Sequence, residues 1–352
     1  MNEKVGIVWN PSKVEGEELR EAFERALEGA FAADRDRPEC QWFETTEEDP
    51  GQGAASAAID AGCGLVIAAG GDGTVRAVAE RLGESGSPAA DLGIVPLGTG
   101  NLLARNLGVP LGDARAAFER ALTGSGSPLD LGEVVITRAP AGEGESGPDA
   151  AGTGESEEPG GSGDPAATAA DSAGSERHGF VVMVGFGIDA QMIVETDDEL
   201  KAKTGWLAYV ESLGRAATGT EVVELSLQLD DDAPITESAH TVLVANCGSI
   251  QGGITLLPDA APDDGELDLL VLRADDAGAW LDTMRNMVWD NGLKRLITGG
   301  DKAESSGSTA HLRARTVRAE LPVPLAFEVD GDDVGSVSAF EVRILPAALR
   351  VR

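Results

Sequence analysis

The first 130 residues alternate between short apolar runs and longer segments with apolar residues at helical spacing. The apolar runs predict strands at residues 5–9, 41–43, 65–69 and 92–95, and the periodic segments predict helices at 17–33, 54–61, 75–82 and 114–122. The run 65–69 holds only Leu, Val, Ile and Ala, which is typical of a parallel strand covered on both faces. Repeated strand–loop–helix units therefore predict an α/β layer with a parallel sheet.

After residue 130 the pattern changes, because strand signals outnumber helix signals. Strands are predicted at residues 133–137, 180–184, 222–229, 241–246, 267–272, 325–329 and 340–345, and helices at 206–217 and 277–296. The stretch 139–176 contains no Ile, Leu, Val, Met or aromatic residue, so it cannot bury enough surface to order itself. We interpret it as a disordered acidic insert within a hairpin of the β-rich second part.

The chain is strongly acidic, with 61 acidic and 27 basic residues and a net charge of −34. The insert holds nine of the acidic residues and no basic one, so 52 acidic and 27 basic residues remain outside it, a net charge of −25. Only six of the basic residues are lysines. This composition is typical of cytosolic proteins of salt-accumulating, halophilic organisms. It also argues against a nucleic-acid partner, because the sequence has no basic stripe.

The three cysteines lie far apart, at positions 40, 63 and 247, which indicates a reducing compartment without a disulfide framework. No apolar run approaches the roughly 18 residues of a membrane-spanning helix. The N-terminus predicts a first strand and not a targeting segment. We therefore expect a cytoplasmic protein.

Two loops follow buried strands of the first part. The first is Gly70-Gly71-Asp72-Gly73-Thr74, which opens a predicted helix, and the second is Pro96-Leu97-Gly98-Thr99-Gly100-Asn101. Glycines let backbone N–H groups approach an anion, and a helix N-terminus adds partial positive charge. Ligands of open α/β sheets lie beyond the carboxyl ends of the strands, so the two loops could line one phosphate-binding cleft. The alternative is that both are tight turns capped by Asp72 and Asn101.

With these loops placed, the chain resembles the diacylglycerol kinase catalytic-domain family, close to soluble bacterial lipid kinases. The resemblance rests on elements that occur in the family's order: Asn10-Pro11, the loop 70–74, the loop 96–101 with Leu102-Leu103-Ala104-Arg105, Gly185-Phe186-Gly187, the segment 205–209, Asn246, Pro258-Asp259-Ala260, the segment 264–268, Asp330-Gly331 and the ending 344–349. It covers nearly the whole chain except the insert. The first glycine loop alone is shared with NAD kinases and phosphofructokinase-like enzymes.

The resemblance implies a three-layer α/β domain at residues 1–130, completed by the C-terminal segment 341–352, and a β-rich, sandwich-like domain at 131–340. ATP is expected in the cleft between them. By matched position, the implied nucleotide-binding residues are Thr45, Gly70, Gly71, Asp72, Gly73, Thr74, Val75, Arg76, Ala77, Thr99 and Asn101. Asp72 is implied to act through Mg²⁺ or its waters. A second Mg²⁺ is expected on Asp264 and on the carbonyl oxygens of Ala261 and Glu266.

One position departs from the family. Relatives carry a glutamate after Asp-Gly as the general base, whereas this chain has Asp332. The side chain is one methylene shorter, so the carboxylate could fall short of the substrate hydroxyl. Asp332 is our candidate base, and three alternatives stay open: a backbone that approaches the substrate more closely, replacement by Asp330 or Asp333, or low activity.

The resemblance implies a kinase that uses ATP and Mg²⁺ to phosphorylate the hydroxyl of a lipid alcohol such as diacylglycerol. The lipid is expected to be met by transient contact with a membrane surface. Two other functions stay open: a small-molecule kinase such as an NAD kinase, and a nucleotide-binding regulatory protein without turnover. The oligomeric state is also open, with a homodimer as one option.

The acidity generates a prediction about salt. Repulsion among the surplus negative charges acts over about 30 Å at 0.01 M salt but only about 3 Å at 1 M, so low salt should favour unfolding. We expect the melting temperature to rise from dilute buffer to molar potassium chloride, and Mg²⁺ to substitute in part. A thermal melt across this series checks it, and a flat or falling midpoint would contradict it.

Overall fold

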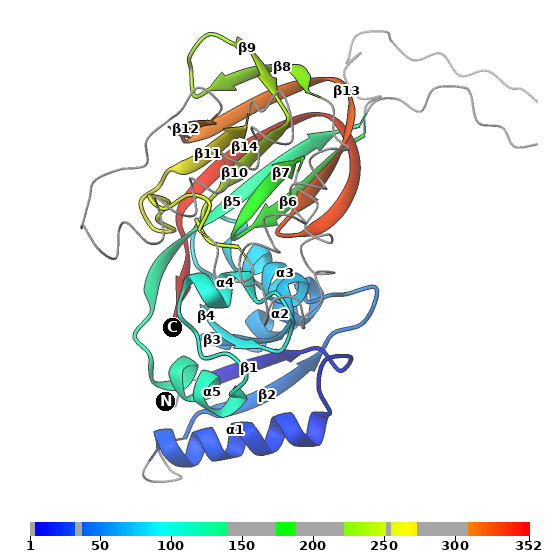
Figure 1. The fold of residues 1–352 in the computed structure, drawn as a ribbon. Coiled ribbons are helices and arrows are strands. Elements are labelled where there is room, and N and C mark those ends of the chain that lie inside the picture. Colours follow the sequence, from blue (N-terminus) through cyan, green and yellow to red (C-terminus); the bar gives the residue numbers. More distant parts are fainter. Residues whose placement is uncertain (1–3, 32–36, 139–173, 188–221, 251–254, 273–308) are drawn as a thin grey trace, which may run out of the picture.

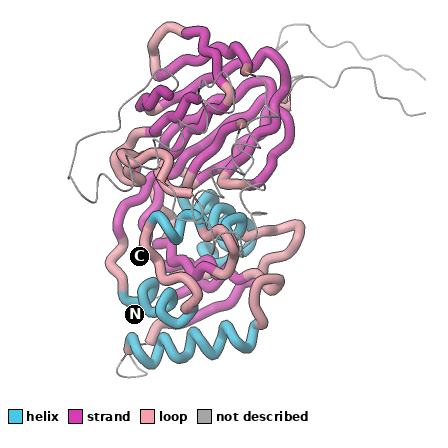
Figure 2. The backbone as a smooth tube through the Cα atoms, in the orientation of Figure 1, coloured by secondary structure: helices cyan, strands magenta, loops and turns pink. Residues whose placement is uncertain are grey.

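The structure is a computed structural model, and it describes residues 4–31, 37–138, 174–187, 222–250, 255–272 and 309–352. The described chain has a lower part in which helices cover a parallel sheet and an upper part built of strands (Figures 1 and 2). The parallel α/β part is N-terminal and the antiparallel β-rich part follows it, which confirms the fold class predicted from the sequence.

Four parallel strands form the sheet of the lower part in the order β4-β3-β1-β2. They are β1 (Lys4–Trp9), β2 (Glu39–Glu44), β3 (Leu65–Gly70) and β4 (Asp91–Pro96). The helices are α1 (Gly16–Ala30), α2 (Gln52–Asp60), α3 (Asp72–Gly83), α4 (Leu102–Asn106) and α5 (Ala114–Thr123). Helices α1 and α5 pack together on one face, and α2 and α3 pack together on the other, next to the β-rich part (Figure 1).

The β-rich part contains the longest strands. They are β5 (Ser127–Thr137), β6 (Ser175–Phe180), β7 (Met183–Phe186), β8 (Val223–Leu229), β9 (Ile235–Ala239), β10 (Thr241–Ala245), β11 (Leu267–Leu272), β12 (Thr309–Ala314), β13 (Thr316–Val329) and β14 (Asp332–Val351). Their pairings within this part are antiparallel. A second hydrophobic core, with Phe180, Phe327 and Phe340, lies between them.

The last strand joins the two parts. Strand β14 pairs along β13 and β5, and then meets the parallel sheet where Val351 lies beside Leu92 of β4. The N–H group of Arg352 donates to the carbonyl oxygen of Leu92 at 3.0 Å. Leu349 and Val351 are buried in the core of the α/β part. The C-terminal residues therefore contribute strand pairing and core packing to the lower part.

The structure differs from several expectations drawn from the sequence. The predicted strands 325–329 and 340–345 are parts of the much longer β13 and β14. The predicted helices 206–217 and 277–296 lie outside the described residues, as does most of the insert 139–176. Ser175 and Glu176, at the end of that stretch, belong to β6, and Glu176 pairs with Arg138 at 2.9 Å.

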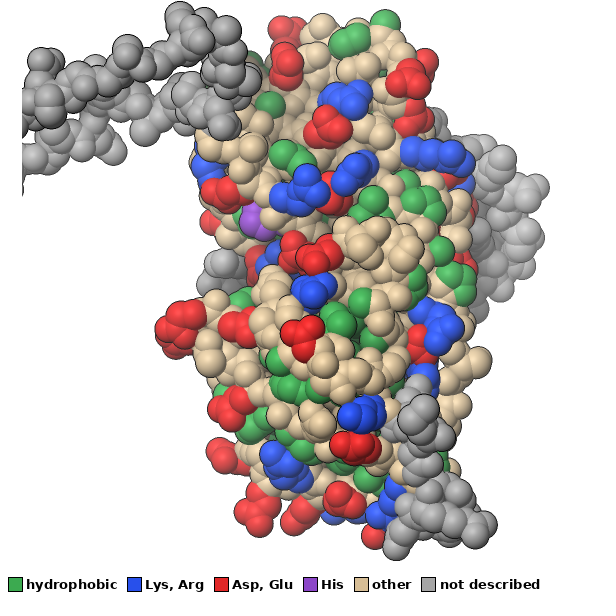
Figure 3. Space-filling view, turned by 180° about the vertical axis from the view of Figure 1, so that it is seen from behind, with side chains coloured by type: hydrophobic (Ala, Val, Ile, Leu, Met, Phe, Trp, Pro, Cys, Tyr) green, Lys and Arg blue, Asp and Glu red, His purple; other side chains and the backbone are tan. Residues whose placement is uncertain are grey.

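Acidic side chains occur on both halves of the face seen in Figure 3, with basic side chains among them. Many ion pairs recorded among the described residues use arginine, including Arg318–Glu341 at 2.9 Å and Arg115–Glu119 at 2.8 Å. Within the described part of the chain, no helix is long and apolar enough to cross a membrane.

The junction between β14 and β4 generates a stability prediction. Asp91 of β4 is 3% exposed and accepts hydrogen bonds from Nε of Arg350 and, at 2.6 Å, from Nε of Arg352. Burial alone would raise the pKa of Asp91. The hydrogen bonds and charges of Arg350 and Arg352 lower it by more, so the pKa of Asp91 lies below its usual value. We expect Asp91→Asn to lower the free energy of unfolding at neutral pH by on the order of 1–3 kcal/mol.

Denaturant melts of both proteins across pH check this prediction. A carboxylate with a lowered pKa stabilises the fold above its unfolded pKa of about 3.9 and loses that contribution as the pH falls through its folded pKa. The difference between the proteins should therefore shrink below about pH 4. Glu341→Gln, which breaks the exposed pair with Arg318, is the matched control and should change stability little.

Candidate active site

The carboxyl ends of the four parallel strands lie along one edge of the sheet. Asn10 follows β1, Thr45 follows β2, Gly71 follows β3 and Leu97 follows β4. Backbone hydrogen bonds connect neighbouring ends: Asn10 N–H donates to the Ala69 carbonyl at 3.0 Å, and Thr45 N–H donates to the Trp9 carbonyl at 3.0 Å. This edge is therefore one continuous rim of loops, as the sequence predicted for the two glycine loops.

The loop after β3 is packed tightly against its own helix. A methyl group on Gly70 would lie 2.6 Å from Cβ of Thr74, which is itself only 3% exposed. Asn10 Nδ2 donates to Oγ1 of Thr74 at 3.4 Å. Helix α3 has Gly71 as its N-cap and begins at Asp72, so the N–H groups of its first turn face the rim without partners inside the helix. That turn has the donors and the dipole to bind a phosphate.

Asp72 connects the two glycine loops. Its Oδ2 accepts from the N–H of Asn101 at 2.7 Å, and its Oδ1 accepts from the N–H of Leu102 at 2.5 Å. These are the N-cap and first residue of α4, so Asp72 caps that helix and not its own. Burial raises the pKa of Asp72, and the negative charge of Asp332 raises it further. The carboxylate is thus both a structural cap and part of an acidic pair.

The two loops approach each other at their glycines. A methyl group on Gly98 would lie 2.8 Å from Cα of Gly71 and 3.1 Å from Oδ1 of Asn101. Asn101 has a left-handed backbone with φ of 49°, and its side chain exchanges two hydrogen bonds with Gly98, at 3.0 and 2.7 Å. Asn101 therefore shapes the second loop, which is the capping role left open as an alternative.

Asp332 comes to the same rim from the start of β14. Its Oδ2 accepts from Nη2 of Arg76 in α3 at 2.6 Å, and it lies 3.6 Å from where a methyl group on Gly73 would be. The Asp332 side chain is 51% exposed and that of Arg76 is 17% exposed. This ion pair joins residues 256 positions apart and places a carboxylate over the first turn of α3.

The neighbouring aspartates have other partners. Asp330 is buried, and its carboxylate accepts three backbone N–H groups, from Val181 and Val182 at 2.8 Å and from Met183 at 2.9 Å. Burial raises the pKa of Asp330 to about 6, although these bonds and Arg76 lower it. Asp333 accepts from the N–H of Gly335 at 2.7 Å within its own turn. Of the three aspartates, Asp332 is the one that faces the glycine loop.

Other predicted nucleotide-binding residues have mixed positions. Thr45 is buried, whereas Thr99 is exposed on the second loop. The side chains of Val75 and Ala77 point into the core, so only their backbone can face a ligand. Lys13 was missed: a methyl group on Gly71 would lie 3.8 Å from its Cε, and no motif marked it. A surface hollow along α1, lined by Gly16, Glu17, Arg20, Glu21, Glu24 and Arg25, includes none of these residues.

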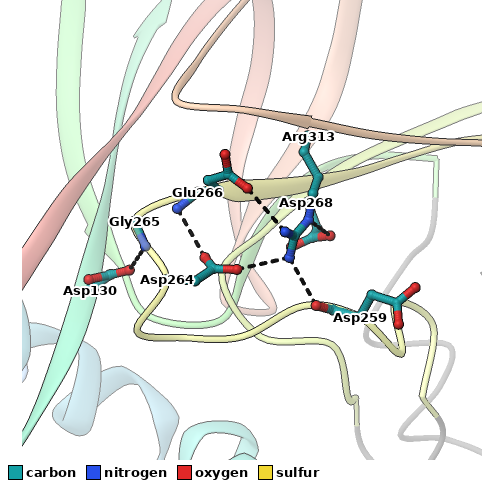
Figure 4. A network of polar contacts seen from close by, with 7 residues as sticks. All are labelled: Asp130, Asp259, Asp264, Gly265, Glu266, Asp268 and Arg313. Atoms are coloured by element: carbon teal, nitrogen blue, oxygen red, sulfur yellow. Dashed lines mark hydrogen bonds and ion pairs between the residues drawn. The ribbon is translucent and has the colours of Figure 1, made fainter. Parts of the chain in front are cut away.

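The residues expected to bind a second Mg²⁺ lie on the turn before β11. Asp264 Oδ2 and Glu266 Oε2 accept from Arg313 at 2.9 and 3.0 Å, and Asp264 Oδ1 accepts from the Glu266 N–H at 3.1 Å (Figure 4). Ala261 lies three residues before Asp264 on the same turn. Among the residues that the structure describes, no group of three or more His, Cys, Asp or Glu side chains is arranged to hold a metal. Of the expected donor set, Arg313 contacts the Asp264 carboxylate, so its positive charge lies beside the one side chain expected to bind the metal.

Two family profiles match the chain. The profile described as "Diacylglycerol kinase catalytic domain" matches residues 4–134. The profile described as "YegS C-terminal NAD kinase beta sandwich-like domain" matches residues 182–352. The first contains both glycine loops, and the second contains Asp332 and Arg313.

Individual proteins give the same result. A Stenotrophomonas maltophilia protein named "Probable lipid kinase YegS-like" is 30% identical over 320 residues, covering 87% of this chain and 84% of that protein. A Klebsiella pneumoniae protein of the same name is 26% identical over 292 residues, covering 82% and 77%. A crystal structure of a diacylglycerol kinase from Bacillus anthracis matches with a TM-score of 0.61 at 18% identity, covering 99% of this chain and 96% of that one. At this identity the structural match shows the fold.

The contact between the glycine loops is testable. Gly98→Ala places a methyl group against the backbone of Gly71, so we expect a loss of about 1–3 kcal/mol in unfolding free energy. Gly174→Ala is the matched control, because a methyl group there meets no atom within 4 Å. Urea melts of the two variants check the prediction. Equal stability of both variants would show that the loops can separate without cost.

Proposed function

Because the chain belongs to the diacylglycerol kinase catalytic-domain family of bacterial lipid kinases, we propose that it transfers the γ-phosphoryl group of ATP to the hydroxyl of a lipid alcohol. The observation that carries this proposal is the pairing of Arg76 with Asp332 over the first turn of α3. It brings a half-exposed carboxylate from the β-rich part to the helix N-terminus that suits a phosphate. A phosphoryl transfer needs this combination of a phosphate cradle and a nearby proton acceptor.

In this proposal ATP lies between an α/β domain of residues 1–130, completed by 341–352, and a β-rich domain of residues 131–340. The phosphates meet the backbone N–H groups of Gly71, Asp72, Gly73 and Thr74, where the helix dipole favours negative charge. Thr45 and Thr99 lie at the outer ends of the same rim and would contact the rest of the nucleotide. Asn101 supports the second loop from within.

Mg²⁺ is proposed as the partner of ATP at Asp72. The carboxylate uses two lone pairs on N–H groups of α4, and an ionised carboxylate has about four acceptor sites, so it can still bind a metal or its waters. When bound, Mg²⁺ would offset the charge of the phosphates, which the acidic surface otherwise repels. The cap on α4 keeps the Asp72 side chain in one orientation before the nucleotide arrives.

Asp332 is proposed as the general base. Arg76 holds its carboxylate over the first turn of α3, next to the proposed phosphate site. Arg76 also carries a positive charge at the edge of the phosphate site, where it can stabilise charge that develops during transfer. The Asp330 carboxylate accepts hydrogen bonds from the backbone N–H groups of residues 181–183. These bonds restrain the Asp330-Gly331-Asp332 turn.

Two other functions stay in view. A small-molecule kinase could use the same first loop, but the relatives named as probable lipid kinases over most of their length favour a lipid acceptor. A regulatory protein without turnover would need only the nucleotide site, and the aspartate at position 332 is the feature that favours it.

The lipid is proposed to be met at a membrane surface from the cytoplasmic side. High salt would weaken repulsion between the acidic protein and anionic lipids.

The test uses the full-length protein with radiolabelled ATP, Mg²⁺ and total lipid extract at molar salt. We expect label in an organic-soluble product, and Asp332→Asn and Asp72→Asn should each lower its rate by about 10²–10⁴-fold. Asp333→Asn is the matched control, because it is the next residue and keeps an acceptor for Gly335; its rate should stay within about twofold. Circular dichroism checks that each variant is folded.

Other results would redirect the proposal. A labelled product that stays in the aqueous phase identifies a small-molecule kinase. ATP binding without any labelled product identifies the regulatory alternative. Equal loss of activity in Asp333→Asn and Asp332→Asn would remove the assignment of Asp332 as base.

A further inference from the structure

The turn before β11 is organised around one guanidinium group (Figure 4). Arg313 of β12 donates from Nε to Asp268 Oδ1 at 3.1 Å, from Nη1 to Glu266 Oε2 at 3.0 Å, and from Nη2 to Asp264 Oδ2 at 2.9 Å and to the Asp259 carbonyl oxygen at 3.0 Å. A planar fork with five N–H donors can make such a set of contacts, whereas a lysine ammonium cannot. The turn therefore binds a cation that is part of the chain, with the Arg313 side chain 42% exposed.

The sheet register explains why these groups meet. Asp268 of β11 lies directly opposite Arg313 of β12 in the antiparallel pair. Glu266 is two residues before Asp268, so its side chain points to the same side of the strand. Gly265, with φ of 75°, turns the chain so that Asp264 also faces the guanidinium. Three carboxylates from one short segment thus converge on one arginine.

A divalent cation at this turn would use the Asp264 carboxylate, which the family resemblance implies as a ligand together with the carbonyl oxygens of Ala261 and Glu266. Asp264 Oδ2 accepts from Nη2 of Arg313 at 2.9 Å, so the guanidinium lies against the one side chain of that ligand set. An arginine this close adds a positive charge that disfavours a second cation. We propose that Arg313 is a built-in cation that replaces a bound divalent metal at the turn formed by residues 259–268.

The turn is hydrogen-bonded, through Asp130, to the junction between the two parts of the molecule. The Gly265 N–H donates to Asp130 Oδ2 at 2.7 Å, and the Ala347 N–H of β14 donates to Asp130 Oδ1 at 2.6 Å. A cation that holds the turn therefore also supports β14 near its entry into the lower sheet. With arginine in this role, the support does not depend on the supply of divalent ions.

The experiment measures metal binding by nucleotide-free, full-length protein, so its result is independent of kinase activity. Mn²⁺ is titrated in molar potassium chloride and its free fraction is followed by electron paramagnetic resonance, because oxygen sites for Mg²⁺ also accept Mn²⁺. We expect the wild type to show no saturable site. Arg313→Met, which keeps an apolar stem, should gain one site with a Kd of about 0.1–1 mM, in the range of weak oxygen-ligand sites.

Two further variants test where that site is. Asp264→Asn combined with Arg313→Met should lose the new site, because the shared carboxylate is gone. Arg318→Met removes an arginine from the exposed pair with Glu341 in the neighbouring strands and should gain no site. Mn²⁺ should also raise the melting temperature of Arg313→Met but not that of the wild type.

Two results would overturn the proposal. The first is a saturable Mn²⁺ site in the wild type that Asp264→Asn removes, because Arg313 would then yield to the metal. The second is a folded Arg313→Met protein with no new Mn²⁺ site, because the turn would then not bind a divalent cation even when Arg313 is absent. If Arg313→Met does not fold, the wild-type and Asp264→Asn titrations decide: a wild-type site lost in Asp264→Asn overturns the proposal, and no wild-type site supports it.

Discussion

The candidate site depends on one strand that belongs to both parts of the molecule. Strand β14 carries Asp332 at its first residue and pairs with β4 of the parallel sheet near its last. Between these points its backbone pairs with β13 and then with β5, and at the break in pairing after Leu345 the Ala347 N–H donates to Asp130. Asp91 anchors the far end through Arg350 and Arg352. The position of Asp332 over α3 follows from this arrangement.

Helix α3 is the matching element on the other side. It receives Asp332 through Arg76 near its first turn, and further along Glu80 accepts from the Gly179 N–H at 3.0 Å, at the end of β6. Two polar contacts with the β-rich part therefore fix the helix whose N-terminus is the proposed phosphate site. Asp72 links the same turn to α4. Pre-organisation of this kind lowers the cost of ordering the site when a ligand binds.

Buried carboxylates in this acidic chain have specific donors. Buried Asp130 and Asp330, like the half-buried Asp72, accept backbone N–H groups, whereas Asp91, Glu133 and Asp268 pair with arginines. The first group shapes turns and helix ends, and the second connects strands. The scarcity of lysine matches this use, because arginine can bond two or more oxygens at once. Arg313 makes the most such contacts in this set, because it donates hydrogen bonds to four residues of one turn.

The sequence by itself determined the local features: the buried strand before Gly70, the glycine turn that opens α3, and the order of motifs that identifies the family. These follow from residues close together in the chain, whose spacing sets strand, turn and helix. It also indicated Asp332 as the departure from the family's glutamate and as the candidate base, but it left replacement by Asp330 or Asp333 open. It could not see that Val75 and Ala77 face the core, because side-chain direction depends on what packs around α3.

Only the tertiary structure decided the contacts between distant residues. Position 76 meets position 332, Asp91 meets the C-terminus, and Arg313 occupies the turn where Ala261, Asp264 and Glu266 were expected to bind a metal. Each of these depends on strand register, and a shift of one residue would turn Arg313 to the opposite face of the sheet. Register is set by the packing of whole strands against a shared core, which no short stretch of sequence contains.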